Sequence, residues 1–306
     1  MGTSKKPVSV ISYVGGKSQL VPNIVPIIEF AAREYGLSDY YELCGGGARM
    51  LLNLPPNLFE RRVYNDMDRG LCNLFACLGD KNYLYELMAL LEEQGVGEDV
   101  FLKAKHAREY EARMLLNGSD FELDRVTSAA YAYIVTQQSR AAMMTKFDMS
   151  RVTDKGRLQS YFKRVRNIDR NYSIFSGVEI TCGDVFEWLD LLRGKNNGFV
   201  YLDPPYIPDS SMVLTEHYGG NSWLVADHER LVDKLLDIGD IKVALSGYNN
   251  ECYSRLENAG WRKLYLKEVH VSSSAVGRKN TEFLWISFSL PKSLEEQVCM
   301  IDYTAW

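Results

Sequence analysis

The stretch NGFVYLDPPYIPDSS, residues 197–211, carries the clearest signal for the fold. Its apolar run, FVYL, is typical of a strand buried inside a parallel sheet. Asp203 ends the run and is kept out of the helical region because Pro204 follows it. Pro204 and Pro205 stiffen the turn and donate no backbone N–H, so carbonyl acceptors stand beside the Asp203 carboxylate. With the flat ring of Tyr206 next in sequence, this turn suits a planar substrate ring that carries an exocyclic amino group.

Strand-like segments alternate with helical ones on both sides of this stretch. The strand segments are DYYEL at 39–43, RRVYND at 61–66, GVEITCGD at 177–184, IKVALSGY at 241–248, RKLYLKEVHV at 262–271 and EFLWISFSL at 282–290. One of the helical segments, DHERLVDKLLDIG, is amphipathic and ends at Gly239. This alternation predicts βαβ units and a mainly parallel sheet. We expect the last strand segment in an antiparallel edge hairpin, because no crossover helix has room to follow it.

A long helical block interrupts the alternation. Residues 81–170 have apolar side chains at helical spacing, most clearly in DRVTSAAYAYIVTQQSRAAM at 124–143. We therefore predict an α/β domain formed by residues 1–77 and 171–306, with a helical insertion at 78–170.

Composition sets broad limits on the class of protein. The 306 residues are 46% hydrophobic and 25% charged, which is ordinary for a globular protein. The start of the sequence has no apolar signal segment, and no apolar run approaches the roughly 18 residues of a membrane span. The six cysteines lack C-x-x-C spacing, which favours buried thiols in a reducing compartment over a metal site or disulfides. These features predict a cytoplasmic protein with no metal and no membrane partner.

Charge is unevenly distributed along the chain. The formal net charge is −5, which argues mildly against a protein that binds nucleic acid. The window from Arg140 to Arg170 nevertheless holds nine basic and three acidic residues, a net charge of +6 by 9 − 3. The basic residues are Arg140, Lys146, Arg151, Lys155, Arg157, Lys163, Arg164, Arg166 and Arg170. A solvated helical face and a surface for a phosphate-bearing partner both fit this window.

Two glycine motifs precede the helical block. In YVGGKSQL at 13–20 the P-loop spacing fails, because Ile11 stands where a glycine is needed; this excludes a P-loop nucleotide site. In YELCGGGARM at 41–50 a strand runs into three glycines, and we expect a helix from about Arg49. Such a loop brings a cofactor against bare backbone at a sheet's carboxyl edge. Asp66, nineteen residues after Gly47, is placed to accept hydrogen bonds from ribose hydroxyls, although helix capping also explains it.

Together these motifs resemble the Dam-like adenine-N6 class of DNA methyltransferases. Asp203-Pro204-Pro205-Tyr206 resembles the catalytic motif of amino-methylating enzymes. Residues 13–17, 42–47 and 64–66 are similar to the class's aromatic-x-Gly-Gly-Lys element, its glycine loop and its ribose-binding acid. The order of the elements also matches over most of the chain, except for the insertion and the tail. The chain departs from the usual pattern at Leu43-Cys44, often Pro-Phe, and at Tyr13, often Trp.

The resemblance implies a Rossmann-like class I methyltransferase core that uses S-adenosylmethionine (SAM), with the helical insertion as a target-recognition subdomain. It implies the catalytic residues Asp203, Pro204 and Tyr206. It implies the cofactor-binding residues Tyr13, Lys17, Glu42, Gly45, Gly47, Asp66, Asp184, Phe186 and Asp203, with Lys17 near the carboxylate of SAM. Phe186 fits either the adenine of SAM or the apolar core. An RNA adenine-N6 methyltransferase stays as the alternative, because the pocket chemistry is shared.

The implied substrate is duplex DNA whose target adenine leaves the helix. Tyr206 would stack on that base, so we expect its ring to matter and its hydroxyl to matter little. The implied DNA-binding residues are Arg140, Lys146, Arg151, Lys163, Arg164 and Arg166. Some of Gln137, Gln138, Ser139 and Arg140 are weaker candidates for reading base edges, and the same residues also fit a buried helix turn. The segment IPDSSMVLTEHYGGNS at 207–222 is a candidate for a loop over the base. The resemblance also implies a bacterial or phage-infected cell. We expect a monomer or weak dimer, with any cognate restriction enzyme acting separately.

Overall fold

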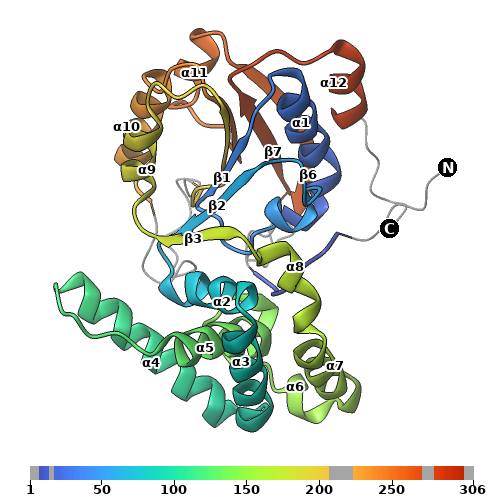
Figure 1. Cartoon of the computed structure of the whole chain (residues 1–306), viewed down its shortest axis with the longest axis vertical. Coiled ribbons are helices and arrows are strands. Elements are labelled where there is room, and N and C mark those ends of the chain that lie inside the picture. Colours follow the sequence, from blue (N-terminus) through green and yellow to red (C-terminus); the bar gives the residue numbers. More distant parts are fainter. Residues whose placement is uncertain (1–6, 14–16, 207–222, 271–278, 300–306) are drawn as a thin grey trace. The chain divides into compact units, whose positions relative to one another are not determined.

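The computed structural model describes residues 7–13, 17–206, 223–270 and 279–299 (Figure 1). The predicted loop at 207–222 therefore lies outside the described residues. By its internal contacts the chain divides into two compact units. One unit comprises Met1–Val8, Lys17–Met67 and Gly183–Trp306, and the other comprises Ser9–Gly16 and Asp68–Cys182.

The strands form a seven-stranded sheet in the order β3-β2-β1-β4-β5-β7-β6. Their bounds are Asp39–Leu43 for β1, Arg61–Asp66 for β2, Val178–Cys182 for β3, Gly198–Leu202 for β4, Lys242–Tyr248 for β5, Arg262–His270 for β6 and Lys279–Ile286 for β7. Strand β1 pairs in parallel with β2 and β4, and β4 with β5, whereas β7 pairs antiparallel with both β5 and β6. The mainly parallel α/β fold and the antiparallel hairpin are confirmed.

Helices cover both faces of this sheet within the α/β unit (Figure 1). They are α1 at Val21–Glu34, α9 at Val185–Leu192, α10 at Val225–Leu236, α11 at Ser254–Asn258 and α12 at Lys292–Cys299, with 3-10 turns at Lys17–Gln19 and Leu51–Asn53. Every residue of β4 is buried, as the run FVYL predicts. Val200 and Leu202 pack with the α9 and α10 core, whereas Phe199 on the opposite face contacts the rings of Tyr40 and Phe288. Burial on both faces explains why β4 is apolar without alternation.

The helical unit is built around α5, Arg125–Gln138, which is buried along Ser128–Gln138. The other helices are α2 at Arg69–Gly79, α3 at Lys81–Gln94, α4 at Glu98–Leu116, α6 at Ser150–Thr153, α7 at Lys155–Arg166 and α8 at Tyr172–Phe175, with 3-10 turns at Arg140–Ala142 and Ile168–Asn171. Helix α2 packs on α5, and a side chain at Gly70 would meet the Cβ of Ala132 at 3.0 Å. This packing places α2 in the helical unit, whose longer segment, Asp68–Cys182, extends beyond the predicted insertion at 78–170 on both sides.

Two local predictions differ from the structure. The helix expected from Arg49 is wrong: turns and the short 3-10 turn Leu51–Asn53 follow the glycine loop. A left-handed residue, Ala48 with φ 51°, stands where that helix would begin. The base-reading interpretation of Gln137, Gln138 and Ser139 is also wrong, because all three are buried. The Gln138 side chain donates to the Gly95 carbonyl at 2.8 Å and accepts from the Gly97 N–H at 3.3 Å, which ties α5 to the α3–α4 turn.

Among the described residues, no helix is both long and apolar enough to cross a membrane.

Candidate active site

The site is built where the parallel strands end. Strand order reverses between β1 and β4, and ligands of open α/β sheets bind outside the carboxyl ends of the strands at such a switch point. The loop after β1 carries Gly45, and Asp203 follows β4 directly. Strand β7 runs antiparallel to β5, with Glu282 opposite Tyr248, so this early residue of β7 reaches the same edge.

Four side chains meet at this edge. The Lys17 ammonium lies 3.1 Å from Oδ1 of Asp203 and 3.8 Å from Oε1 of Glu282. The Tyr206 hydroxyl lies 3.1 Å from the same Oδ1 and 2.9 Å from Oε2 of Glu282. Lys17 also stands 4.3 Å from the centre of the Tyr206 ring, and the edge of that ring packs on Tyr248. The polar contacts of Asp203 therefore fall on one oxygen, and Lys17 covers a face of the tyrosine ring.

The charges of this cluster do not balance. Two carboxylates face one ammonium, and Lys17 and Glu282 are both buried, with 6% and 4% of their surface exposed. Burial raises the pKa of Asp203, which the ammonium of Lys17 opposes. Burial also raises the pKa of Glu282, and the charge of Asp203 adds to that rise. Burial favours the neutral form of each carboxyl group. Because two carboxyl groups face one ammonium, the cluster favours a hydrogen-bond donor or a cation over a further anion.

The glycine loop turns sharply beside this cluster. Cys44 has a left-handed backbone with φ 60°, and Gly46 follows with φ 47°. The Gly46 N–H donates to Oδ2 of Asp66 at 2.7 Å, and its carbonyl accepts from the Tyr64 hydroxyl at 2.9 Å. Asp66, at the end of β2, thus stands against the loop, and its role as a ribose-binding acid stays a prediction.

Gly45 has no room for a side chain, which gives a stability prediction. A Cβ at Gly45 would lie 2.3 Å from a ring carbon of Tyr64, a buried side chain fixed by its hydroxyl hydrogen bond. We expect Gly45→Ala to destabilise the protein by about 1–3 kcal/mol through overpacking. The check is thermal unfolding beside Gly183→Ala, where the new Cβ meets only an ordinary contact at 3.9 Å. Equal melting temperatures for the two variants would contradict this prediction.

Comparison with known proteins decides what kind of site this is. The family model for D12 class N6 adenine-specific DNA methyltransferases matches residues 13–276. The chain belongs to this family. It is 25% identical over 288 residues to the Type II methyltransferase M1.LlaDCHI of Lactococcus lactis subsp. cremoris, which covers 89% of this chain and 92% of the relative. It is also 25% identical over 276 residues to the Type II methyltransferase M.MjaIII of Methanocaldococcus jannaschii, covering 85% and 91%.

The chain is therefore a DNA adenine-N6 methyltransferase, and the predicted family, enzyme class and methyltransferase fold are confirmed. The predicted site residues of this methyltransferase stay predictions, and the structure shows where each of them lies. Gly47 is buried within the turns that follow β1. Pro204 is buried directly after Asp203.

Glu42 of the methyltransferase points inward from β1. Its Oε2 accepts from the Tyr40 hydroxyl at 3.0 Å and from the Leu51 N–H at 2.6 Å, and its Oε1 accepts weakly from the Met50 N–H at 3.4 Å. Burial raises the pKa of Glu42 from 4.5 to about 7. These contacts give the carboxylate a role in holding the chain after the glycine loop, whatever it contributes to a cofactor.

The two predicted cofactor residues after β3 have internal contacts as well. Asp184 caps α9, accepting the Phe186 N–H at 2.9 Å. The Phe186 ring stacks on Trp223 with centroids 5.3 Å apart, and the Arg230 guanidinium lies 3.9 Å from its centre. Packing of Phe186 on the adenine of SAM therefore requires Trp223 or Arg230 to leave the ring.

Tyr13 lies in the helical unit and interacts electrostatically with Arg108. Arg108 holds both carboxylate oxygens of Asp68 at 2.8 and 2.5 Å, so Tyr13 stands beside a partly buried ion pair.

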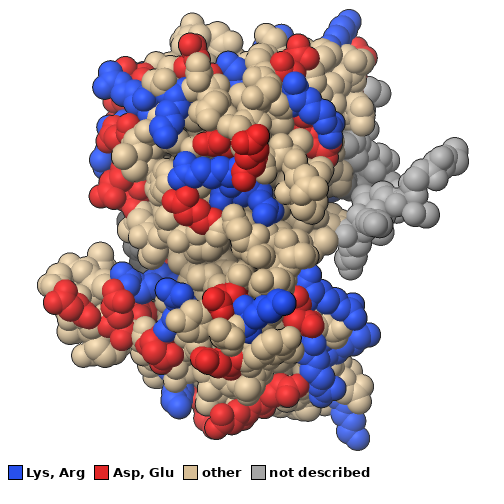
Figure 2. Space-filling model, viewed as in Figure 1, with Lys and Arg blue, Asp and Glu red and all other residues tan. Residues whose placement is uncertain are grey.

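The predicted DNA-binding residues fall into two groups. Arg140, Lys146, Lys163 and Arg166 are exposed. Arg151 and Arg164 are half-buried: Arg151 lies 3.6 Å from Asp148, and the guanidinium of Arg164 donates to Ser160 at 3.1 Å. Figure 2 shows basic side chains gathered over the α6–α7 end of the helical unit, whereas acidic side chains are frequent along α4.

Glu282 is the residue that sequence reasoning missed. A glutamate directly before the apolar run FLWI of β7 is a signal in itself, because a carboxylate that becomes buried needs partners.

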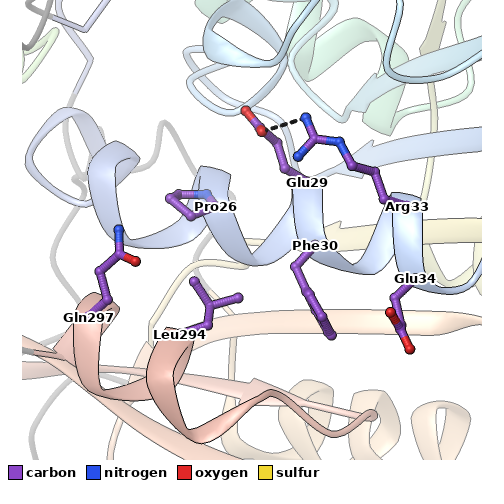
Figure 3. Close-up of a pocket in the computed structure, with 7 residues that line it drawn as sticks. All are labelled: Pro26, Glu29, Phe30, Arg33, Glu34, Leu294 and Gln297. Carbon is purple, nitrogen blue, oxygen red and sulfur yellow. Dashed lines mark hydrogen bonds and ion pairs between the residues drawn. The ribbon is translucent and has the colours of Figure 1, made fainter. Parts of the chain in front are cut away.

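A separate cavity of about 390 Å³ lies between α1 and α12 (Figure 3). It is lined by Pro26, Glu29, Phe30, Arg33, Glu34, Leu294 and Gln297. Its arginine pairs with Glu29 at 2.8 Å within α1, and none of the lining residues is a predicted site residue.

Proposed function

We propose that this methyltransferase transfers the methyl group of SAM to N6 of an adenine rotated out of duplex DNA. The observation that carries the proposal is the position of Asp203 at the carboxyl end of β4, with Oδ1 held by the Lys17 ammonium at 3.1 Å. Oδ2 then has lone pairs for one N–H of the target amine, and the neighbouring carbonyl of Pro204 would accept the other. These acceptors draw the weakly nucleophilic N6 toward tetrahedral geometry and stabilise the positive charge that grows on it.

The residues at the strand ends suit SAM in their chemistry. Asp66 and Asp184 supply acceptors for hydroxyl groups, and the bare backbone of Gly45 to Gly47 lets a ligand approach closely. When bound, SAM supplies an electrophilic methyl group on a sulfonium: the N6 lone pair takes the methyl group, the sulfur keeps the electrons of the broken bond as a thioether, and N6 then loses one proton to water. The protein then has to hold the amine in line with that methyl group and exclude water, for which no covalent nucleophile is needed.

Lys17 has contacts with the proposed acceptor residues. Its ammonium pairs with Oδ1 of Asp203 and covers a face of the Tyr206 ring, so a base that stacks on that face needs the Lys17 side chain to move off the ring.

The proposal is tested by tritium transfer from labelled SAM to genomic duplex DNA and, in parallel, to structured RNA. We expect label in DNA as N6-methyladenine, and mapping by long-read sequencing should place it at one short sequence. Label in RNA alone would support the RNA alternative and overturn the DNA proposal.

We also propose that the exposed basic residues of the helical unit contact phosphates. Replacing Arg140, Lys146 and Lys163 by glutamine should weaken binding to all DNA sequences and flatten its salt dependence by roughly 0.9 log–log units per lost contact. Arg164 is left intact in this variant because it packs within the helical unit. Lys292→Gln on α12, where the side chain is 91% exposed, is the matched control. An unchanged salt dependence in the triple variant would mean that these three residues contact solvent and not phosphates.

The Type II methyltransferase relatives favour a place in a restriction–modification system, and a restriction enzyme acting separately stays a prediction, as does the monomer or weak dimer.

A further inference from the structure

The Tyr206 hydroxyl has one proton and two carboxylate neighbours. It lies 2.9 Å from Oε2 of Glu282 and 3.1 Å from Oδ1 of Asp203. A hydroxyl donates one hydrogen bond at a time, so the two carboxylates compete for it. The shorter distance favours donation to Glu282.

The choice of acceptor changes the chemistry of Asp203. Oδ1 already accepts from the Lys17 ammonium at 3.1 Å. A second donor on that oxygen would withdraw more charge from the carboxylate and weaken the acceptor that Asp203 offers to a target amine. When the hydroxyl donates its hydrogen bond to Glu282, the Asp203 carboxylate keeps its full negative charge. The same hydrogen bond holds the Tyr206 ring in place.

The fold holds Glu282 firmly for this purpose. It sits on β7 between β5 and β6, opposite Tyr248, and only 4% of it is exposed. Burying a carboxylate is costly, and an apolar residue at this position would avoid that cost. A function for the carboxylate explains its presence at a buried position of β7.

We infer that Glu282 is a positioning residue of the methyl-acceptor pocket, which acts on Asp203 by accepting the hydroxyl proton of Tyr206. The inference rests on the proposed function and adds to it a residue that acts through Tyr206. It also replaces our expectation that the Tyr206 hydroxyl matters little, because that hydroxyl has two carboxylate neighbours.

The test is a double-mutant cycle on the full chain with Glu282→Ala, Tyr206→Phe and both together. Methyl transfer to duplex DNA is measured at saturating SAM and DNA. Each single variant should lower kcat about ten- to hundredfold, the range for a lost hydrogen bond to a charged group. The double variant should be no slower than the slower single variant, since one hydrogen bond is lost in all three. The dissociation constant of SAM should stay within about twofold.

The conservative variant Glu282→Gln distinguishes hydrogen bonding from charge. Its amide oxygen still accepts the hydroxyl proton, so kcat should recover to within about fivefold of wild type. Glu257→Ala is the matched control, because Glu257 accepts a hydrogen bond at 3.0 Å from the aromatic side chain of Trp285 outside the pocket. We expect no change of kcat in that control.

Three results would overturn the inference: losses that multiply in the double variant, a glutamine variant as slow as the alanine variant, or wild-type kcat in Glu282→Ala. A wild-type protein that leaves adenine in duplex DNA unmethylated would instead overturn the proposed function, before any Glu282 variant is compared.

Discussion

An Asp203→Ala variant should stay folded and bind SAM, yet transfer methyl groups at least about 10²–10³-fold more slowly than wild type. That range is typical for loss of one preorganised group that stabilises charge in a transition state. Asp203 contributes the only carboxylate of the Asp-Pro-Pro-Tyr turn, directly after the buried strand β4. Because burial raises the pKa of Asp203, its removal should cost the fold little.

The measurement compares single-turnover transfer, SAM affinity and thermal unfolding of the same preparation. Asp203→Asn is the matched variant: it keeps one acceptor oxygen in the same place and should fall between alanine and wild type. A folded alanine variant with near-wild-type turnover would remove Asp203 from the mechanism. A variant that fails to bind SAM would show that Asp203 serves the donor side instead.

The turn around Asp203 was predictable because its signals are local. A run of apolar residues predicts a buried strand, and two prolines fix the backbone that follows, so both features are readable without knowledge of distant residues. The same holds for the alternation of strands and helices that gives the parallel sheet. Local patterns of this kind are consistent with the global fold in most natural sequences.

Glu282 was not predictable in the same way, because its role depends on strand register. Only the antiparallel pairing of β7 with β5 brings Glu282 opposite Tyr248 and so to the edge where Asp203 lies. A shift of that register by one residue would turn the carboxylate to the other face of the sheet. The sequence shows a glutamate in β7, but only the pairing of β7 with β5 determines which side chains that glutamate contacts.

The missing helix after the glycine loop has a comparable cause. Glu42, on β1, accepts the N–H groups of Leu51 and Met50, and Ala48 has a left-handed backbone. A carboxylate from the preceding strand thus satisfies backbone donors of the segment where the helix was expected. The helix propensity of residues 48–54 therefore could not predict that contact.

The same carboxylate leads to a pH effect that we expect on stability. The pKa of Glu42 is 4.5 in an ordinary environment and about 7 in the folded protein, where burial raises it. The folded state therefore keeps a proton that the unfolded state releases. The resulting stabilisation is complete below about pH 4.5 and is lost as the pH rises to about 7. A shift of this size corresponds to a loss on the order of 3 kcal/mol in the free energy of unfolding.

Glu42→Gln isolates this effect, because the amide is neutral at every pH and its oxygen can still accept the Leu51 N–H. Urea unfolding of both proteins between pH 4.5 and pH 8 gives the difference in the free energy of unfolding. Asp203 and Glu282, whose pKa values burial also raises, titrate in both proteins and largely cancel in that difference. We expect the difference to move in favour of Glu42→Gln by on the order of 3 kcal/mol as the pH rises. Parallel stability curves would mean that Glu42 is ionised in the folded protein throughout this range, so that its three internal donors outweigh its burial.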